Sequence, residues 1–194
     1  MRSCVIVGNS TALLDKEYGE FIDSHDRVIR MNRVLNLLPQ YEKQLGKKTD
    51  MLTMARPVES LPQHPDIDIV MWLCSEQEYN ERCTDDIKVA IEPKFYAGGK
   101  LLFYNQSRRE QLKKIIGKLP TAGMMTVEWV VRQINNHTDS LFPGNWLINI
   151  IGFDFFEHAS IVTGQNNSAK WHNPDAERVI IETFAMLGYI NIIR

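Results

Sequence analysis

The segment Ser3-Cys-Val-Ile-Val-Gly-Asn-Ser10 is an apolar run that ends in a tight polar turn. The run predicts a buried strand, and the Gly-Asn-Ser turn is expected to leave backbone N–H groups unpaired where that strand ends. Much later, Leu119–Val127 (L-P-T-A-G-M-M-T-V) predicts a turn that enters a helix near Thr121. The first turn of a helix also has unpaired N–H groups, and the helix dipole adds a partial positive charge there. We therefore expect these two distant segments to form one site for a phosphate or a carboxylate.

Composition excludes several classes of protein. The 194 residues suffice for a substantial core, and we predict one domain over residues 1–194. The 22 Lys and Arg residues nearly balance 24 Asp and Glu, which argues against nucleic-acid binding by charge. No apolar stretch approaches the roughly 20 residues that span a bilayer, and the chain enters a strand at once, so we expect neither an anchor nor a signal peptide. Cys4, Cys74 and Cys83 form no C-x-x-C pair, which predicts reduced thiols and a cytoplasmic location.

Strand-like runs alternate with helical patterns, which predicts an α/β fold with a mostly parallel, twisted sheet and helices on both faces. The capping box Ser107–Glu110 predicts the start of a helix that Gly117 ends. A second helix follows the Thr121 turn, and a third begins at the Asn173-Pro174 N-cap. The expected strands are Cys4–Val7, Arg27–Met31, Asp50–Met54, Ile67–Cys74, Ile87–Ile91, Leu101–Tyr104, Trp146–Ile151 and Tyr189–Ile193.

Three stretches follow one another in a characteristic order: Arg2–Ser10 with Gly19–Asn32 and Gly46–Thr49, then Pro120–Met124 with the later strand through Ile151-Gly-Phe153, then His172–Glu177. The first resembles the large sialyl motif of the sialyltransferases, glycosyltransferase family 29. The second resembles the family's small motif. The third, a His and a Glu separated by four residues, is similar to its very small motif. The resemblance extends over most of the chain.

This resemblance implies a single-domain, GT-A-like and Rossmann-like variant that needs no metal or other cofactor. Such an enzyme moves sialic acid from its CMP ester to a glycan hydroxyl with inversion, so the implied partners are a CMP-sugar donor and a glycan acceptor. Asn9, Ser10 and Asn32 would contact the CMP donor, whereas Thr121 and Gly123 would hold the sugar carboxylate and phosphate. The residues implied at the donor site are Gly8, Asn9, Ser10, Asn32, Thr121, Ala122, Gly123, Gly152, Phe153, Asp154 and Glu177.

The sequence departs from the family's pattern in three places. Animal members join a cysteine of the large motif to one of the small motif, but here only Cys4 is present, because residues 120–153 contain no cysteine. This favours a bacterial or viral protein of the cytoplasm over a Golgi enzyme. Ala122 replaces a hydroxyl residue, which removes one expected donor contact. The family's third motif, a His followed by two aromatics and an acid, has no clean counterpart, and His158 is its nearest candidate.

The predicted chemistry can also be argued from the residues. His172 lies just before the N-cap of the last helix, whose positive end disfavours the imidazolium and so favours a neutral ring that accepts a proton. The resemblance implies that His172 is the catalytic base, and its position before the helix agrees with that role. Glu177 is near enough to orient the ring or the start of the helix. His158 would add a proton or charge at the departing phosphate. The less specific interpretations are a capping role for His172 and Glu177 and a surface role for His158.

Two further patterns imitate functional sites. Asp66-Ile-Asp68 resembles a metal-binding D-x-D motif, but it opens an apolar strand, whereas a metal motif belongs at a strand's far end. We therefore predict no metal dependence. His25 lies between two acids where a helix is expected to end, and we assign it to the scaffold.

Other functions remain open at this stage. The closest alternative is a Kdo transferase that uses CMP-Kdo, because the site is expected to recognise CMP and a carboxylate. A non-catalytic nucleotide- or glycan-binding module with the same fold would account for Ala122 and the missing third motif. A dehydrogenase is the weakest alternative, since Gly8-Asn-Ser lacks the G-x-G-x-x-G pattern.

Overall fold

The described strands form one sheet in the order β5-β4-β3-β2-β1-β6-β7, and each neighbouring pair is parallel. The computed structural model describes residues 1–55, 67–82, 100–136, 141–166 and 170–194. The strands are β1 (Arg2–Val7), β2 (Arg27–Met31), β3 (Met51–Met54), β4 (Ile69–Trp72), β5 (Lys100–Phe103), β6 (Trp146–Ile151) and β7 (Asn191–Ile193).

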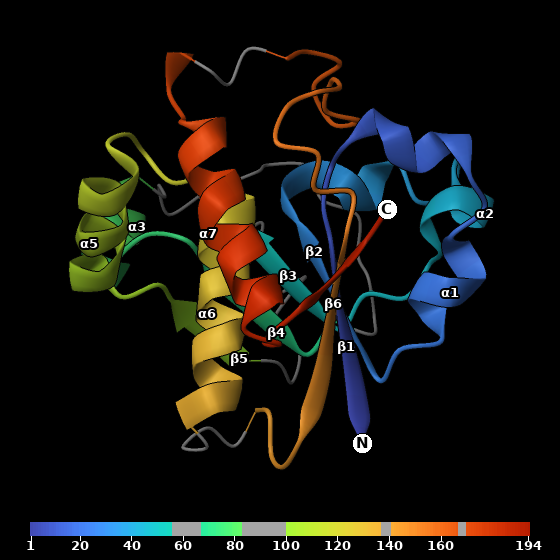
Figure 1. The fold of residues 1–194 in the computed structure, drawn as a ribbon, viewed down its shortest axis with the longest axis horizontal. Coiled ribbons are helices and arrows are strands. Elements are labelled where there is room, and N and C mark those ends of the chain that lie inside the picture. The colour runs from blue at the N-terminus through green and yellow to red at the C-terminus, as the bar shows by residue number, and fades with distance from the viewer. Residues whose placement is uncertain (56–66, 83–99, 137–140, 167–169) are drawn as a thin grey trace.

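Helices cover both faces of this sheet (Figure 1). One face packs against α5 (Gln106–Ile116), α6 (Ala122–Asn136) and α7 (Pro174–Met186). The other packs against α1 (Gly19–Asp23), α2 (Glu42–Leu45), α3 (Glu76–Arg82) and the 3-10 helices η1 (Thr11–Asp15) and η2 (Asn32–Asn36). The α/β class, the parallel sheet and the helices on both faces are thus confirmed.

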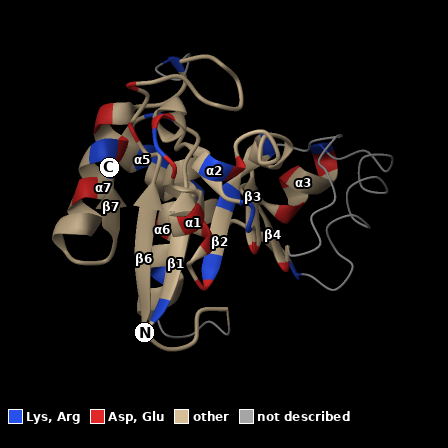
Figure 2. Ribbon diagram, turned by 90° about the vertical axis from the view of Figure 1, so that its right-hand side faces the viewer, with Lys and Arg blue, Asp and Glu red and all other residues tan. Residues whose placement is uncertain are grey.

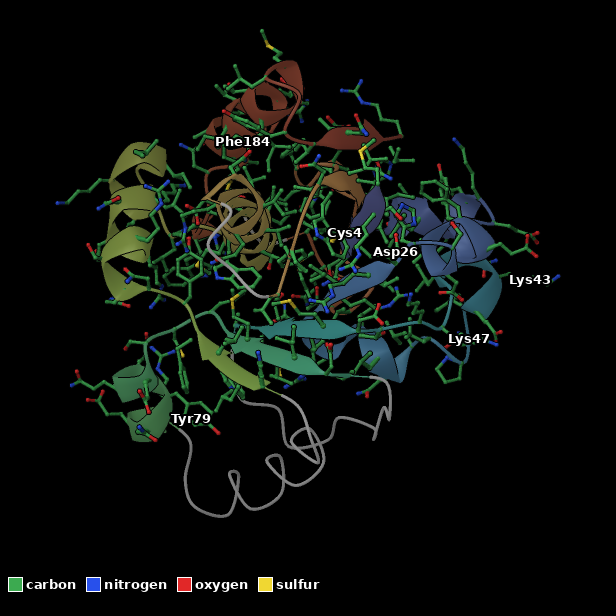
Figure 3. All side chains as sticks on the ribbon, turned by 90° about the horizontal axis from the view of Figure 1, so that it is seen from below. Cys4, Asp26, Lys43, Lys47, Tyr79 and Phe184 are labelled. Carbon is green, nitrogen blue, oxygen red and sulfur yellow. The ribbon has the colours of Figure 1, made fainter. Side chains whose placement is uncertain are left out.

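The alternation of side chains along β1 explains why its sequence is apolar throughout. Cys4 and Ile6 belong to the core under α6, whereas Val5 and Val7 belong to the core on the opposite face. All four side chains are buried, as expected for a central parallel strand. Figure 3 shows Cys4 within this interior, whereas Lys43 and Lys47 extend outward from α2 and the residues after it.

The sheet has a switch point between β1 and β6. From β1 the chain adds β2, β3, β4 and β5 in order on one side, and it then returns through α5 and α6 to place β6 on the other side of β1. Parallel sheets of this kind bind ligands outside the carboxyl ends of the strands at such a point. The turns after β1 and β6 therefore mark where a ligand site is expected.

Most predicted elements are confirmed within a few residues. The expected strand Ile87–Ile91 lies outside the described residues. The capping box at Ser107 is wrong, because Asn105 is the N-cap and its side chain accepts a hydrogen bond from the Arg108 N–H. The N-cap of α7 at Asn173 is confirmed by the bond that its side chain accepts from the Ala176 N–H.

Buried polar side chains fix the segment between β2 and β3. Arg30 on β2 is fully buried, and it donates hydrogen bonds to the Leu45 and Lys48 carbonyls and to the Thr49 hydroxyl. Burial lowers the Arg30 pKa to about 10, so the side chain stays charged at neutral pH. Guanidinium donors thus satisfy carbonyls at the end of α2 that would otherwise lack partners.

His25 is a structural residue, as the sequence predicts. Its Nδ1 donates to the Phe21 carbonyl at 2.8 Å, and its Nε2 accepts from the Asn149 amide at 2.8 Å. The ring is buried, and both of its nitrogens have partners within the scaffold. His25 therefore links α1 to β6 and has no part in the cavity described below.

Substituting Arg30→Ala should lower the free energy of unfolding by about 3 kcal/mol or more, because two carbonyls and a hydroxyl lose a charged donor in the interior. Urea denaturation with an unchanged m-value would measure this loss. Arg33→Ala removes an exposed arginine of the adjacent η2 and serves as the matched control, with a change below about 0.5 kcal/mol. Equal effects of the two substitutions would contradict the assignment.

Candidate active site

A cavity of about 580 Å³ lies at the carboxyl ends of the strands, between the turns that follow β1 and β6 and the start of α6. It is partly open to solvent and is lined by both polar and apolar side chains. The structure brings every sequence-predicted site residue to its wall: Gly8, Asn9, Ser10, Asn32, Thr121, Ala122, Gly123, Gly152, Phe153, Asp154, His158, His172 and Glu177.

The backbone of the turn after β1 is in direct contact with the backbone of the turn after β6. The Gly8 N–H donates to the Ile151 carbonyl at 2.7 Å, and the Ser10 N–H donates to the Gly152 carbonyl at 3.3 Å. A Cβ on Gly8 would lie 2.1 Å from the Gly152 oxygen, so no larger residue fits there. The expectation that this turn offers a cluster of unpaired N–H groups is therefore wrong for Gly8 and Ser10, because the neighbouring strand's turn already uses them.

Asp154 organises the loop after β6. One carboxylate oxygen accepts from the Phe156 N–H at 3.1 Å. The other accepts from the Ser10 hydroxyl at 2.6 Å, from the His158 N–H at 2.9 Å and from His158 Nδ1 at 2.9 Å. Because a carboxylate only accepts, Nδ1 of His158 carries a hydrogen, and Nε2 is left for a ligand. Asp154 thus connects the turn after β1 to the half-exposed His158 ring.

The backbone of this loop is strained. Phe155 and Phe156 have φ values of 53° and 68°, a left-handed conformation that bulky residues seldom adopt. Both residues line the cavity. Strain of this kind persists only where surrounding contacts impose it, and it is concentrated at functional sites. The hydrogen bonds of Asp154 supply that constraint.

The side chain of Glu177, on α7, is bonded to Thr121 at the start of α6. Its two carboxylate oxygens accept from the Thr121 N–H at 2.8 Å and from the Thr121 hydroxyl at 2.6 Å. The expected roles of both residues therefore need correction. The N–H and the hydroxyl of Thr121 are already bonded to the Glu177 carboxylate. Glu177 therefore orients the Thr121 turn, and it makes no hydrogen bond to the His172 ring. Burial raises the pKa of Glu177 to about 7, although the two bonds from Thr121 act in the opposite direction.

A few polar groups at the cavity still lack partners. Among the described residues, the backbone N–H groups of Asn9, Ala122 and Gly123 make no hydrogen bond, and the buried side-chain Oδ1 of Asn9 has none either. The N–H groups can receive oxygens of an anion, and the Asn9 oxygen can receive a hydroxyl or amino hydrogen. Asn32, by contrast, uses its side-chain oxygen to accept from the Ala55 N–H at 3.0 Å. Its part in the cavity wall is therefore to hold the end of β3.

His172 is held in a defined tautomer. Its Nδ1 lies 2.7 Å from the Leu119 carbonyl, which can only accept, so Nδ1 carries a hydrogen. The ring is parallel to Phe156 within 11°, with centroids 6.1 Å apart. In the neutral ring Nε2 is then an acceptor. The bond to the Leu119 carbonyl fixes this tautomer, and the role of His172 as a base stays a prediction.

Two cavity residues, Arg82 and Arg109, are absent from the predicted site. Arg82 ends α3 and Arg109 lies in the first turn of α5, and the sequence around each is typical of a solvated helix position. Only the packing of α3 beside α5 brings them to the cavity, so no local signal could identify them.

No group of three or more His, Cys, Asp or Glu side chains among the described residues is placed to hold a metal ion. Asp68 of the D-x-D pattern forms an ion pair with Arg27 at 3.3 Å at the start of β4, the end of the strand away from the cavity. Asp66 lies outside the described residues.

Cys4 and Cys74 are buried, free thiols, and Cys83 lies outside the described residues. Burial raises the pKa of the Cys4 thiol to about 12. In the described part of the chain, no helix has the length and apolar character needed to cross a membrane.

Comparisons with known proteins agree with this geometry. Residues 1–81 match the family model of glycosyltransferase family 29 (sialyltransferase). The chain is 37% identical over 82 residues to the Arabidopsis thaliana protein named beta-1,6-galactosyltransferase GALT29A, which covers 37% of this chain and 20% of that protein. It is 32% identical over 106 residues to a Rattus norvegicus beta-galactoside alpha-2,6-sialyltransferase 2, covering 55% of this chain and 18% of the relative. The chain thus spans about a fifth of the length of these relatives.

The fold is similar to that of a mammalian sialyltransferase crystallised with Gal-beta-1-3GalNAc-ortho-nitrophenol. The TM-score is 0.67 at 22% sequence identity, over 99% of this chain and 69% of that structure. A parallel sheet with a cavity and two oriented histidines at its switch point defines an α/β protein with a GT-A-like fold. Within that fold, the family model that residues 1–81 match is that of glycosyltransferase family 29, the sialyltransferase family.

The raised pKa of Glu177 predicts a pH-dependent stability. An acid with a folded pKa of about 7 and a model value of 4.5 binds its proton more tightly in the folded state. Its contribution to stability is therefore present at low pH and is lost as the pH rises from about 4.5 to about 7. Glu177→Gln cannot titrate, and its amide can still bond to Thr121. Relative to the variant, wild type should lose up to about 2.5 kcal/mol of unfolding free energy between pH 5 and pH 8.

Urea denaturation of both proteins at the two pH values measures this difference, and the comparison cancels the other titrating groups. A wild type that gains stability relative to Glu177→Gln at pH 8 would show that the carboxylate is preferentially ionised in the fold.

Proposed function

We propose that this protein transfers sialic acid from CMP-sialic acid to a hydroxyl of a glycan. The observation that carries the proposal is the convergence of unpaired amides, an unpaired Asn9 oxygen and two oriented histidines in one cavity at the switch point of a family 29 fold. The Asn9 oxygen and the amides of Ala122 and Gly123 offer complementary contacts to a ribose or base and to an anion.

His172 would act as the base. Its Nε2 accepts the proton of the acceptor hydroxyl while that oxygen attacks the anomeric carbon. The bond from this carbon to the phosphate oxygen breaks, and its electron pair leaves on CMP. Attack on the face opposite the leaving group inverts the anomeric configuration. The Leu119 carbonyl supports this role because it fixes the tautomer, and general-base catalysis of this kind gives about 10²–10⁴-fold in rate.

The departing phosphate would be stabilised by oriented donors without a metal. The N–H groups of Ala122 and Gly123 lie at the positive end of α6, and His158, held by Asp154 through Nδ1, would donate from Nε2 when its ring is protonated. CMP is already a good leaving group, and one such donor contributes roughly 2.7–4 kcal/mol. We therefore propose metal-independent transfer.

A second candidate function is galactosyl transfer. It is favoured by one observation, the 37% identity over 82 residues to a protein named a beta-1,6-galactosyltransferase. The same cavity would then hold a donor without a carboxylate.

A cytoplasmic location stays a prediction that the free thiols of Cys4 and Cys74 support.

The donor and the metal are tested together. The protein is incubated with a glycan acceptor mixture and CMP-sialic acid, CMP-Kdo or UDP-galactose in turn, each with and without EDTA, and nucleotide release and product mass are measured. We expect transfer from CMP-sialic acid at an unchanged rate in EDTA. Transfer from CMP-Kdo or UDP-galactose alone would reassign the donor, and loss of activity in EDTA would overturn the metal-independent mechanism. Tight CMP binding with no transfer from any donor would indicate a binding module.

The role of His172 is tested by substitution. His172→Ala should lower kcat by two or more orders of magnitude because the acceptor proton loses its receiver, while CMP binding measured by calorimetry persists. Asp175→Asn changes an exposed acid in the first turn of α7 and serves as the control, with kcat near that of wild type. Wild-type turnover in His172→Ala would remove this histidine from the mechanism.

A further inference from the structure

We propose that Arg82 and Arg109 form an anion subsite in the same cavity, and that the acceptor is an acidic glycan whose carboxylate binds there. The inference deepens the proposed function, on which it rests, by naming the class of acceptor. It starts from residues that belong to none of the sialyl motifs described above.

The two arginines converge from different helices on one acid. Glu78 of α3 accepts from Nη1 of Arg109 through one carboxylate oxygen and pairs with Nη2 of Arg82 through the other, each at 2.6 Å. The Glu78 and Arg109 side chains are only 18% and 21% exposed, whereas Arg82 is 54% exposed. Glu78 thus fixes the positions of both guanidinium groups at the cavity wall. Figure 2 shows both signs of charge on α3, beside β4.

The charge of this cluster favours an anion. Two guanidinium groups and one carboxylate leave a net charge of +1, and in the described part of the chain Glu78 is the only acid that pairs with either arginine. Each guanidinium has five N–H donors in a planar fork, and the bond to Glu78 engages one terminal nitrogen of each. Forked donors fixed in place match the two oxygens of a carboxylate.

The position of the pair separates it from the donor end of the cavity. Asn9 and Asp154 follow β1 and β6, whereas Arg82 ends the helix after β4 and Arg109 belongs to the helix after β5. Neighbouring strands are about 4.8 Å apart, so the three to five strand spacings between them amount to about 14–24 Å across the sheet. Two ends this far apart can hold different parts of two substrates.

The start of α6 lies between those ends. The Thr53 hydroxyl on β3 and the Thr126 hydroxyl on α6 are 2.9 Å apart, which places the first turns of α6 over β3. Leu119, whose carbonyl holds His172, lies in the turn before this helix, which begins at Ala122. A sugar with its hydroxyl at His172 and its donor at the β1 and β6 turns would therefore extend its remaining part toward Arg82 and Arg109.

The test measures binding without turnover. Calorimetry in the presence of saturating CMP compares sialyllactose with lactose, two probes that differ by one carboxylate-bearing sugar. Wild type should bind sialyllactose about tenfold more tightly than lactose, and Arg109→Gln and Arg82→Gln should each reduce this ratio to about threefold or less. Arg82 is largely exposed, so its variant tests the subsite even where Arg109→Gln weakens the fold. Lys113→Gln removes a charge from the exposed part of α5 and should keep the wild-type ratio.

The outcomes separate the subsite from the proposed reaction. Equal affinities of wild type for the two probes, or a ratio that the arginine variants leave unchanged, would overturn the subsite, even in an enzyme that transfers sialic acid. Loss of the ratio in both variants would support the subsite, even in a protein that transfers nothing. If both variants instead weaken CMP-sialic acid relative to CMP and keep the probe ratio, the arginines bind the donor's carboxylate and the acceptor assignment is wrong.

Discussion

The contact between the turns after β1 and β6 is the constraint on which the rest of the site depends. Gly8 and Gly152 approach until a single added carbon would overlap a carbonyl oxygen. This approach lets the Gly8 and Ser10 amides bond to the opposite turn, and it brings the Ser10 hydroxyl to Asp154. Asp154 in turn holds the backbone of the next four residues. The pairing of β1 with β6 therefore fixes the position of His158 through Ser10 and Asp154.

Internal carboxylates give the cavity an unusual electrostatic balance for a protein proposed to bind an anionic donor. Asp154 and Glu177 each occupy donors that a phosphate could otherwise use. Glu177 repels a bound anion less than a fully ionised acid would, because burial raises its pKa to about 7. A bound anion nearby would favour its neutral form further. The hydrogen bonds to Glu177 also have a benefit, because they fix the orientation of the groups that donate them. The Thr121 turn is held by Glu177 before any ligand arrives, so the adjacent amides of Ala122 and Gly123 need little reorganisation.

The sequence predicts the fold well because its signals are local. The continuous apolar run of β1, the Asn173-Pro174 N-cap and the alternation of strands with helices each depend on neighbouring residues, and each is confirmed. Apart from the capping box at Ser107, which is misplaced locally, its errors concern pairing over long distances. Unpaired amides at Gly8 and Ser10 are a sound inference from a turn in isolation, but β6, far along the chain, supplies their acceptors. Glu177 lies near His172 in sequence, yet its partner is Thr121, 56 residues away. Arg109 reaches the cavity only through tertiary packing, which no periodicity encodes.

The extent of the family match bears on where substrate choice resides. The matched residues 1–81 include β1 to β4 and the donor-side turn at Gly8–Ser10, and they end one residue before Arg82. Arg109 and α5 lie wholly outside the match. A scaffold shared with proteins named for different sugars can fix the position of a nucleotide, but it cannot by itself choose the acceptor, because specificity depends on particular side chains at the site. The arginine pair stands where such a choice can be made: on the cavity wall, fixed by Glu78, and carried by helices at the β4 and β5 side of the sheet. A change at these positions would alter the accepted glycan and leave the turn between β1 and β6 intact.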